Sequence, residues 1–175
     1  MRQDFFKLSK KEIKGLMIYY FIILIISIVI IIPSILFESI KHQFSFEISI
    51  SVISIIGGIG TALCGSAIFY LRKLYKSSIN TNSEGSVTIV EQINDMGYYA
   101  YFFLRPWFAI AFAILLHLVL KSGIHIITVP ETQLSEGFIY LSLILSFFAG
   151  FSAGDAITLL ESKGKDFVEK AFNNF

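Results

Sequence analysis

Apolar residues dominate this chain in four long runs that contain no charged side chain. The runs cover residues 15–37, 48–71, 106–120 and 137–154. Because roughly 20 apolar residues cross a bilayer as a helix, the pattern predicts four transmembrane helices at about 15–37, 48–71, 98–121 and 137–157. We therefore expect an all-α, polytopic membrane protein that forms a single domain over residues 1–175, with a loop at 72–97 and a tail at 158–175.

Basic residues predict how the helices are oriented. Eleven lysines and arginines lie in the N-terminal segment, the loop after the second run and the tail, whereas only Lys41 and Lys121 lie on the other side. Since lysine and arginine accumulate in cytoplasmic segments, we expect both termini to be cytoplasmic in a multi-pass protein of the inner (cytoplasmic) cell membrane. Aromatic residues near that end have the positions of an interfacial belt: Tyr19, Tyr20, Tyr70, Tyr98, Tyr99, Tyr101 and Trp107.

Small residues recur at helical spacing in the second and fourth runs, whereas the first run is mostly isoleucine. The small positions are Ser54, Gly58, Ala62 and Ser66, the neighbouring Gly57, Thr61 and Gly65, and in the fourth run Ser142, Ser146, Gly150 and Gly154. Small residues at this spacing let two helix backbones approach closely. We favour packing within one chain, with a subunit interface as the alternative, and expect the first helix to be peripheral and to face lipid.

The third predicted helix carries ionisable residues on one face. Arg105, Ala109, Ala113, His117 and Lys121 are four residues apart. A charge in a membrane helix normally faces protein or water and has a partner, and Asp155 ends the fourth run at a similar expected depth. The two charges therefore form an electrostatic latch between the helices, or they reach water separately. Pro106 disfavours helical geometry at the preceding residue, which predicts a kink or a helix start.

His117 has a functional and a structural interpretation. A histidine titrates near physiological pH, with an unperturbed pKa of about 6.5, so it could gate a path or relay protons. In the antiparallel register of the last two helices His117 lies at the level of Ser142, to which it could simply hydrogen-bond. We favour the structural interpretation.

The sequence offers little for catalysis, and we predict that the protein is not an enzyme and holds no cofactor or metal. Gly150 to Gly154 spell G-x-S-x-G, but a nucleophile elbow needs a preceding strand and a later histidine, and no histidine follows His125. Cys64 is the only cysteine, so no disulfide framework or zinc cluster is available within the chain. The net charge of +1 favours no polyanion, and we expect no direct binding to nucleic acid.

Three segments outside the membrane runs have their own signals. Residues 77–86 (SSINTNSEGS) are typical of a polar, flexible linker. Residues 87–96 (VTIVEQINDM) have apolar positions at helical spacing, so we prefer a short interfacial helix, although a strand over 87–90 fits equally well. Residues 158–172 form an amphipathic segment that is predicted to lie on the inner leaflet or to pair with another tail.

Two short motifs carry a resemblance to other proteins. Phe103-Leu104-Arg105-Pro106, with Lys121-Ser122-Gly123, and the stretch from Phe148 to Ser152 (FAGFS) resemble small bacterial membrane proteins with an Arg-Pro opening the penultimate helix and A-G-F-S in the last. The resemblance covers about residues 98–160. Some small polytopic proteins of this kind accompany phage-defence loci, including CRISPR-associated membrane accessory proteins, so the resemblance implies a membrane effector or accessory in antiviral defence.

Two functions follow as expectations. The first is a homo-oligomeric pore or membrane-perturbing effector, in which Arg105, His117 and Asp155 line or latch a path and the small residues Gly58, Ala62, Ser146, Gly150 and Gly154 pack the helices. The second is a non-conducting membrane anchor whose cytoplasmic segments recruit a cytoplasmic protein. Both have the lipid bilayer as their first partner.

Overall fold

The computed structural model describes residues 10–37, 49–80, 89–127 and 136–173. Four helices account for nearly all of these residues: α1 (Lys10–Ile35), α3 (Ile50–Asn80), α4 (Ile89–Ile127) and α5 (Glu136–Asn173). Each contains a stretch long and apolar enough to cross a membrane, namely Lys11–Ile35, Ile50–Tyr75, Tyr99–Gly123 and Gly137–Ile157. The predicted all-α fold with four membrane-spanning helices is confirmed, and the chain is a multi-pass membrane protein.

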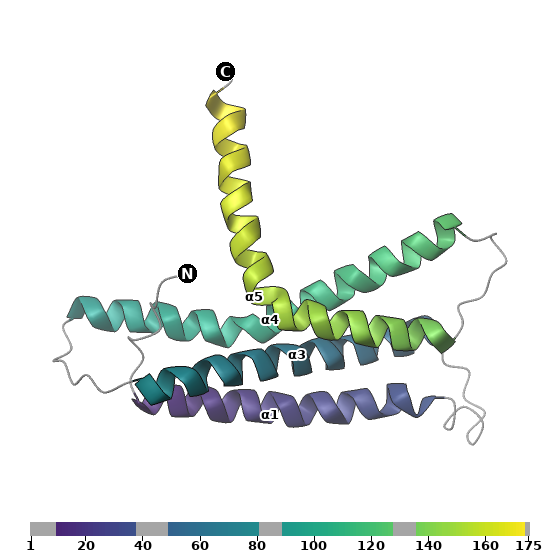
Figure 1. Ribbon diagram of the computed structural model, residues 1–175, viewed down its shortest axis with the longest axis horizontal. Coiled ribbons are helices and arrows are strands. Elements are labelled where there is room, and N and C mark those ends of the chain that lie inside the picture. Colours follow the sequence, from purple (N-terminus) through teal and green to yellow (C-terminus); the bar gives the residue numbers. More distant parts are fainter. Residues whose placement is uncertain (1–9, 38–48, 81–88, 128–135, 174–175) are drawn as a thin grey trace.

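Helix α3 is the centre of the bundle. It contacts α1, α4 and α5, whereas α1 packs mainly on α3 and barely reaches α4. In Figure 1, α1 and α3 lie side by side along the long axis, and the green first part of α5 follows α3. Successive helices run in opposite directions, so the start of α1 and the end of the α5 span lie at the same end of the bundle, which we call the terminal end.

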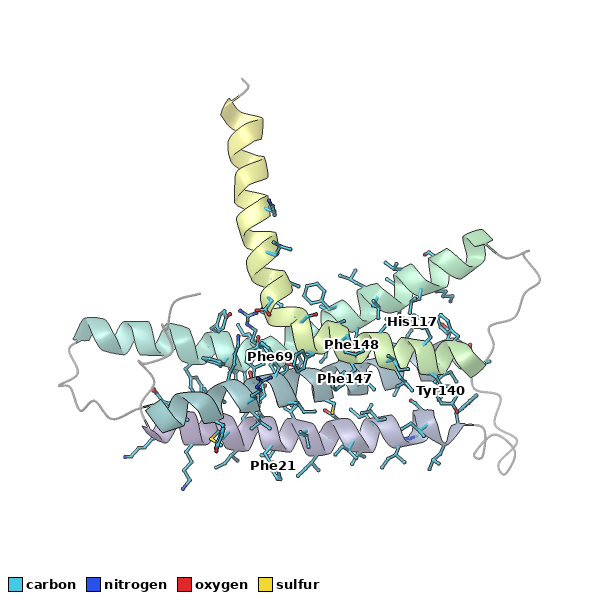
Figure 2. All side chains as sticks on the ribbon, in the orientation of Figure 1. Phe21, Phe69, His117, Tyr140, Phe147 and Phe148 are labelled. Carbon is cyan, nitrogen blue, oxygen red and sulfur yellow. The ribbon has the colours of Figure 1, made fainter. Side chains whose placement is uncertain are left out.

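The outer surface of α1 is exposed and apolar, as expected for a peripheral helix. Phe21 is 58% exposed and Val29 63%, and Figure 2 shows Phe21 pointing away from the other helices. One narrow face of α1 is buried against its neighbours and consists of Ile13, Leu16, Tyr20, Ser27 and Ser34. This face is narrow because a peripheral helix touches the bundle along one line only.

Small residues bring α3 and α5 into backbone contact. A Cβ atom on Gly150 would overlap the main-chain carbonyl of Ala62, and one on Gly65 would overlap the carbonyl oxygen of Phe147. Such an approach is open only to residues without a bulky side chain. The small-residue stripes predicted from the sequence therefore pack on each other within one chain.

Helices α3 and α4 are longer than predicted. Helix α3 continues to Asn80, so residues 77–80 are helical instead of belonging to a linker, and the rest of that segment lies outside the described residues up to 88. Helix α4 begins at Ile89, which makes residues 89–96 a helix and not a strand. Both helices thus extend beyond their spans into the predicted loop at 72–97, and residues 89–96 are helical, as the preferred interpretation of 87–96 expected.

Pro106 lies inside α4 and does not start it. Proline removes a backbone hydrogen bond and crowds the preceding turn, which bends a helix that continues through it. Figure 1 shows α4 changing direction along its length, with its green second half diverging from α1 and α3. Of the two predicted outcomes, a kink or a helix start, the structure has the continuous, bent helix.

The tail is a direct continuation of α5, which is helical to Asn173. In Figure 1 the yellow C-terminal part of α5 turns away from the bundle, across the direction of α1 and α3. A helix that crosses the direction of the spanning helices would lie along a membrane surface instead of entering the bilayer. This geometry agrees with an interfacial segment, which a long amphipathic helix can form.

Candidate intramembrane polar site

The ionisable face of α4 is buried as its spacing predicts. Arg105 is 1% exposed, Ala109 0%, Ala113 2% and His117 1%. Residues four apart lie on one side of a helix, and here that side faces α3 and α5. Ala109 and Ala113 pack with Ala62 of α3 and Ala153 of α5, which leaves Arg105 towards the terminal end and His117 towards the other.

Arg105 joins α4 to the backbone of α5. Its Nη1 donates a hydrogen bond of 2.9 Å to the carbonyl oxygen of Gly154. The guanidinium also stacks on Tyr101, with its Cζ atom 3.7 Å from the ring centroid, and Tyr70 lies on another side at 5.9 Å. Nε and Nη2 have no hydrogen-bond partner among the described residues. The charge is thus enclosed by aromatic rings and one carbonyl.

Asp155 follows the residue that accepts this hydrogen bond. Its side chain is exposed, in contrast to the enclosed guanidinium of Arg105. The carboxylate lies within electrostatic range of Tyr70 and Lys73. Arg105 and Asp155 therefore lie at a similar level along α4 and α5, as predicted. An ion pair between their side chains stays a prediction.

An aromatic cluster closes the terminal end of the bundle around Arg105. Tyr20 of α1, Tyr70 of α3 and Phe102 of α4 are each at most 1% exposed. Tyr20 stacks on Tyr70 at 5.5 Å between centroids, and its hydroxyl donates to the carbonyl oxygen of Phe102. Tyr20 and Tyr70 are therefore core residues and not members of the predicted interfacial belt, whereas Trp107 is 60% exposed.

His117 binds a different serine from the one predicted. Its Nε2 lies 3.2 Å from the hydroxyl of Ser51 in α3, and its ring packs edge-on against Phe138 of α5 at 5.4 Å. Ser142 instead donates to the carbonyl oxygen of Ser54, at 3.5 Å. The predicted bond to Ser142 is wrong because His117 lies at the level of Phe138, one turn nearer the start of α5. In Figure 2, His117 lies well away from Phe69 along the bundle.

Lys121 completes this second polar cluster. Its Nζ donates to the Ser51 hydroxyl at 3.5 Å. A lysine ammonium can only donate, so the Ser51 oxygen accepts from Lys121. The direction of the bond between Ser51 and Nε2 of His117 depends on the histidine tautomer, and Nδ1 of His117 has no partner among the described residues.

Buried hydroxyls form a polar stripe between α3 and α5. Ser54, Ser66, Ser142 and Ser146 are all 0% exposed. The hydroxyls of Ser54, Ser66 and Ser146 have no hydrogen-bond partner among the described residues. Together with Arg105 and His117, they place several polar groups in the interior of an otherwise apolar bundle.

The structure brings together few groups that could perform chemistry. Within the described ranges, no three His, Cys, Asp or Glu side chains are grouped so that they could hold a metal ion. Ser152, the central residue of the G-x-S-x-G string, is exposed on α5 and donates to the carbonyl oxygen of Phe148, 2.8 Å away on its own helix. A serine hydroxyl bonded to the preceding turn is the usual state of serine inside a helix.

No protein family matches this chain, and neither the curated proteins nor the solved structures yielded a match.

Proposed function

We propose that the protein is a non-enzymatic, non-conducting membrane anchor that presents helical segments to a cytoplasmic partner protein. The observation that carries this proposal is that α4 and α5 both extend beyond their membrane spans at the terminal end. Helix α4 begins at Ile89, ahead of a span that starts at Tyr99, and α5 continues from the end of its span at Ile157 to Asn173. These extensions offer surface outside the bilayer that a simple four-helix bundle lacks.

Packing within the chain supports an anchor over a pore. The small-residue stripes of α3 and α5 pack against each other at Gly65 and Gly150. They are therefore not available to form a subunit interface. The outward surfaces of α1 and α4 carry large apolar side chains, such as Val29 and Val119, which are 63% and 68% exposed. Lipid tails suit such a surface without any second subunit.

The positive charge of the terminal end supports a cytoplasmic orientation for the extensions. Lys11, Lys14, Arg72 and Lys163 are exposed residues of this part of the chain. Lysine and arginine are retained on the cytoplasmic side of the inner membrane. The proposal therefore includes both termini in the cytoplasm.

A measurement of ion flux distinguishes the proposed anchor function from a pore. The purified chain, reconstituted in liposomes loaded with a potassium-sensitive dye, is expected to give no flux above protein-free liposomes. Proximity labelling from a C-terminal tag in cells should mark a defined partner, and deletion of residues 158–175 should abolish that labelling while the truncated chain remains in the membrane. Selective ion flux, with labelling unchanged by the deletion, would refute the anchor.

A homo-oligomeric pore is the second candidate, and the buried polar stripe favours it. Arg105, His117 and three serine hydroxyls have polar atoms without partners among the described residues, which is costly in an apolar medium unless water or a moving ion supplies the contact. In this alternative Arg105, His117 and Asp155 line or latch the path. Rings with an axial opening in electron micrographs would support it.

For the biological process, we propose an accessory role in bacterial phage defence. The support is the resemblance of the Arg105-Pro106 and A-G-F-S motifs to small bacterial membrane proteins, together with the occurrence of some small polytopic proteins of this kind at phage-defence loci. Cells with and without the gene, within its native locus, should differ in plaque formation when challenged with a phage panel. Equal plaque counts across the panel would refute the role in phage defence. They would not contradict the proposal that the protein is a membrane anchor.

A further inference from the structure

The guanidinium of Arg105 has donors that the bundle does not use. Nη1 is bonded to the carbonyl oxygen of Gly154, but the N–H groups of Nε and Nη2 have no acceptor among the described residues. Stacking on Tyr101 does not satisfy them, because N–H bonds point outward in the guanidinium plane while a ring contacts its face. A charged donor that is 1% exposed normally has an acceptor of opposite charge.

Tyr70 adds a second unused donor beside Arg105. Its hydroxyl oxygen and Nη1 of Arg105 both lie next to Gly154, where a Cβ atom would overlap the hydroxyl and come within 3.1 Å of Nη1. The two side chains are within electrostatic contact, yet the hydroxyl completes no hydrogen bond with the described residues. Even if it accepted from Arg105, its own hydrogen would still need an acceptor.

Basic and acidic side chains both lie near Tyr70 in the described part of the chain. Lys73 lies 5.8 Å from the centre of the Tyr70 ring, and Arg105 lies 5.9 Å from it. Asp155 is the acidic residue that acts on the same ring. The basic side chains of Lys73 and Arg105 therefore lie close to the donors of Arg105 and Tyr70 that the described residues leave unused.

These groups lie near the boundaries of their spans at the terminal end. Arg105 is six residues from the start of its span at Tyr99, which is about 9 Å along a helix. Its Cα–Cβ bond leans towards the start of α4, as in every helix, and so towards the terminal end. Tyr70 and Gly154 also lie within the last turns of their spans. A long side chain that leans towards the boundary can reach the headgroup layer.

We infer that Arg105 and Tyr70 form a binding site for a phosphate group, either that of an anionic phospholipid or free phosphate. Phosphate oxygens accept two parallel hydrogen bonds from a guanidinium fork, and basic sites between membrane helices bind anionic headgroups. Tyr101, which covers one face of the guanidinium, is 41% exposed, so this face of the site lies next to the surface of the bundle. The inference goes beyond the proposed anchor function, because a bound phosphate is compatible with an anchor or a pore.

The test compares ligands and matched variants in detergent micelles. Native mass spectrometry measures the affinity for phosphatidylglycerol, and thermal unfolding measures the stabilisation by phosphatidylglycerol or by inorganic phosphate. The variants are Arg105→Gln, Tyr70→Phe and, as a control, Arg72→Gln, which removes an exposed arginine from the same end. Tyr70→Phe keeps the ring that stacks on Tyr20, so it reports on the hydroxyl even if Arg105→Gln does not fold.

The expected result is phosphatidylglycerol binding that weakens about tenfold in Arg105→Gln, as for the loss of a charge-assisted bidentate contact. Tyr70→Phe should weaken binding severalfold, and Arg72→Gln should behave as the parent chain. Stabilisation by inorganic phosphate with the same variant dependence would identify free phosphate as the ligand, and its absence would identify the lipid. Unchanged binding of both ligands in Tyr70→Phe and in folded Arg105→Gln would overturn the site.

Discussion

Gly150 of α5 lies directly against the main-chain carbonyl of Ala62 in α3, so that a Cβ atom at this position would overlap it. A main-chain carbonyl cannot turn aside as a side chain can, because it belongs to the helix. This contact therefore fixes the distance between α3 and α5 along the polar stripe.

Gly150→Ala should destabilise the bundle by about 1–3 kcal/mol, the usual cost of inserting atoms into a packed interior. Gly58→Ala should cost less, because its Cβ would meet the movable hydroxyl of Ser146 at 2.9 Å. Gly15→Ala is the control, since no atom lies within 4 Å of its Cβ position. Unfolding in mixed detergent micelles, followed by circular dichroism, measures all three. Equal effects would mean that the assignment of helix faces is wrong.

His117 and Ser51 should be energetically coupled. We expect a coupling free energy of about 0.6 kcal/mol, typical of hydrogen bonds between membrane helices, from a double-mutant cycle with His117→Ala and Ser51→Ala. His117→Ala with Ser142→Ala provides the matched cycle and should be additive, because Ser142 bonds to Ser54. Coupling to Ser142 instead of Ser51 would contradict the described register of α4 against its neighbours.

Much of this fold follows from the sequence because helical periodicity is local. The absence of charge over long runs identifies the spans, and the four-residue spacing from Arg105 to His117 identifies the buried face of α4. The sequence does not specify axial offsets between helices. A shift of one turn replaces Ser142 by Phe138 beside His117, and no local pattern distinguishes these two arrangements.

The aromatic cluster and the acceptor of Arg105 were missed for a related reason. Tyr20 and Tyr70 have the positions of interfacial residues in the sequence, and only the contact between α1 and α3 makes them core residues. Arg105 bonds to a main-chain carbonyl, an acceptor that every residue offers. The absence of a side chain at Gly154 is the one signal that could have suggested such close contact.

Both termini are expected to be cytoplasmic. On a Cys64→Ala background, single cysteines at Ser45 and Gln133, which lie outside the described residues, should react with a membrane-impermeant maleimide added to intact cells. A cysteine at Ser78, near the end of α3, should react only after the cells are lysed. Labelling of a cysteine at position 78 in intact cells would mean that the orientation is opposite to the one proposed. The extensions of α4 and α5 would then lie outside the cytoplasm.

Arg105 and Asp155 should be only weakly coupled, although they lie at the same end of neighbouring helices. Arg105→Ala should cost about 2 kcal/mol, because it removes a charge-assisted hydrogen bond to the Gly154 carbonyl in a buried setting. Asp155→Ala should cost about 0–1 kcal/mol, since its side chain is exposed and an exposed ion pair contributes little.

The double-mutant cycle decides between a latch and two separate charges. For an exposed carboxylate we expect a coupling free energy below about 1 kcal/mol, measured by unfolding in micelles. A coupling of about 3–5 kcal/mol would instead indicate a buried ion pair and would mean that Asp155 turns inward to occupy Nε and Nη2. Asp155→Asn is the control that keeps the size of the side chain. Nε and Nη2 are also the nitrogens that we assign to phosphate. If Asp155 occupies them and the coupling is strong, the parent chain should not bind phosphatidylglycerol. If the coupling is weak, the parent chain should bind it.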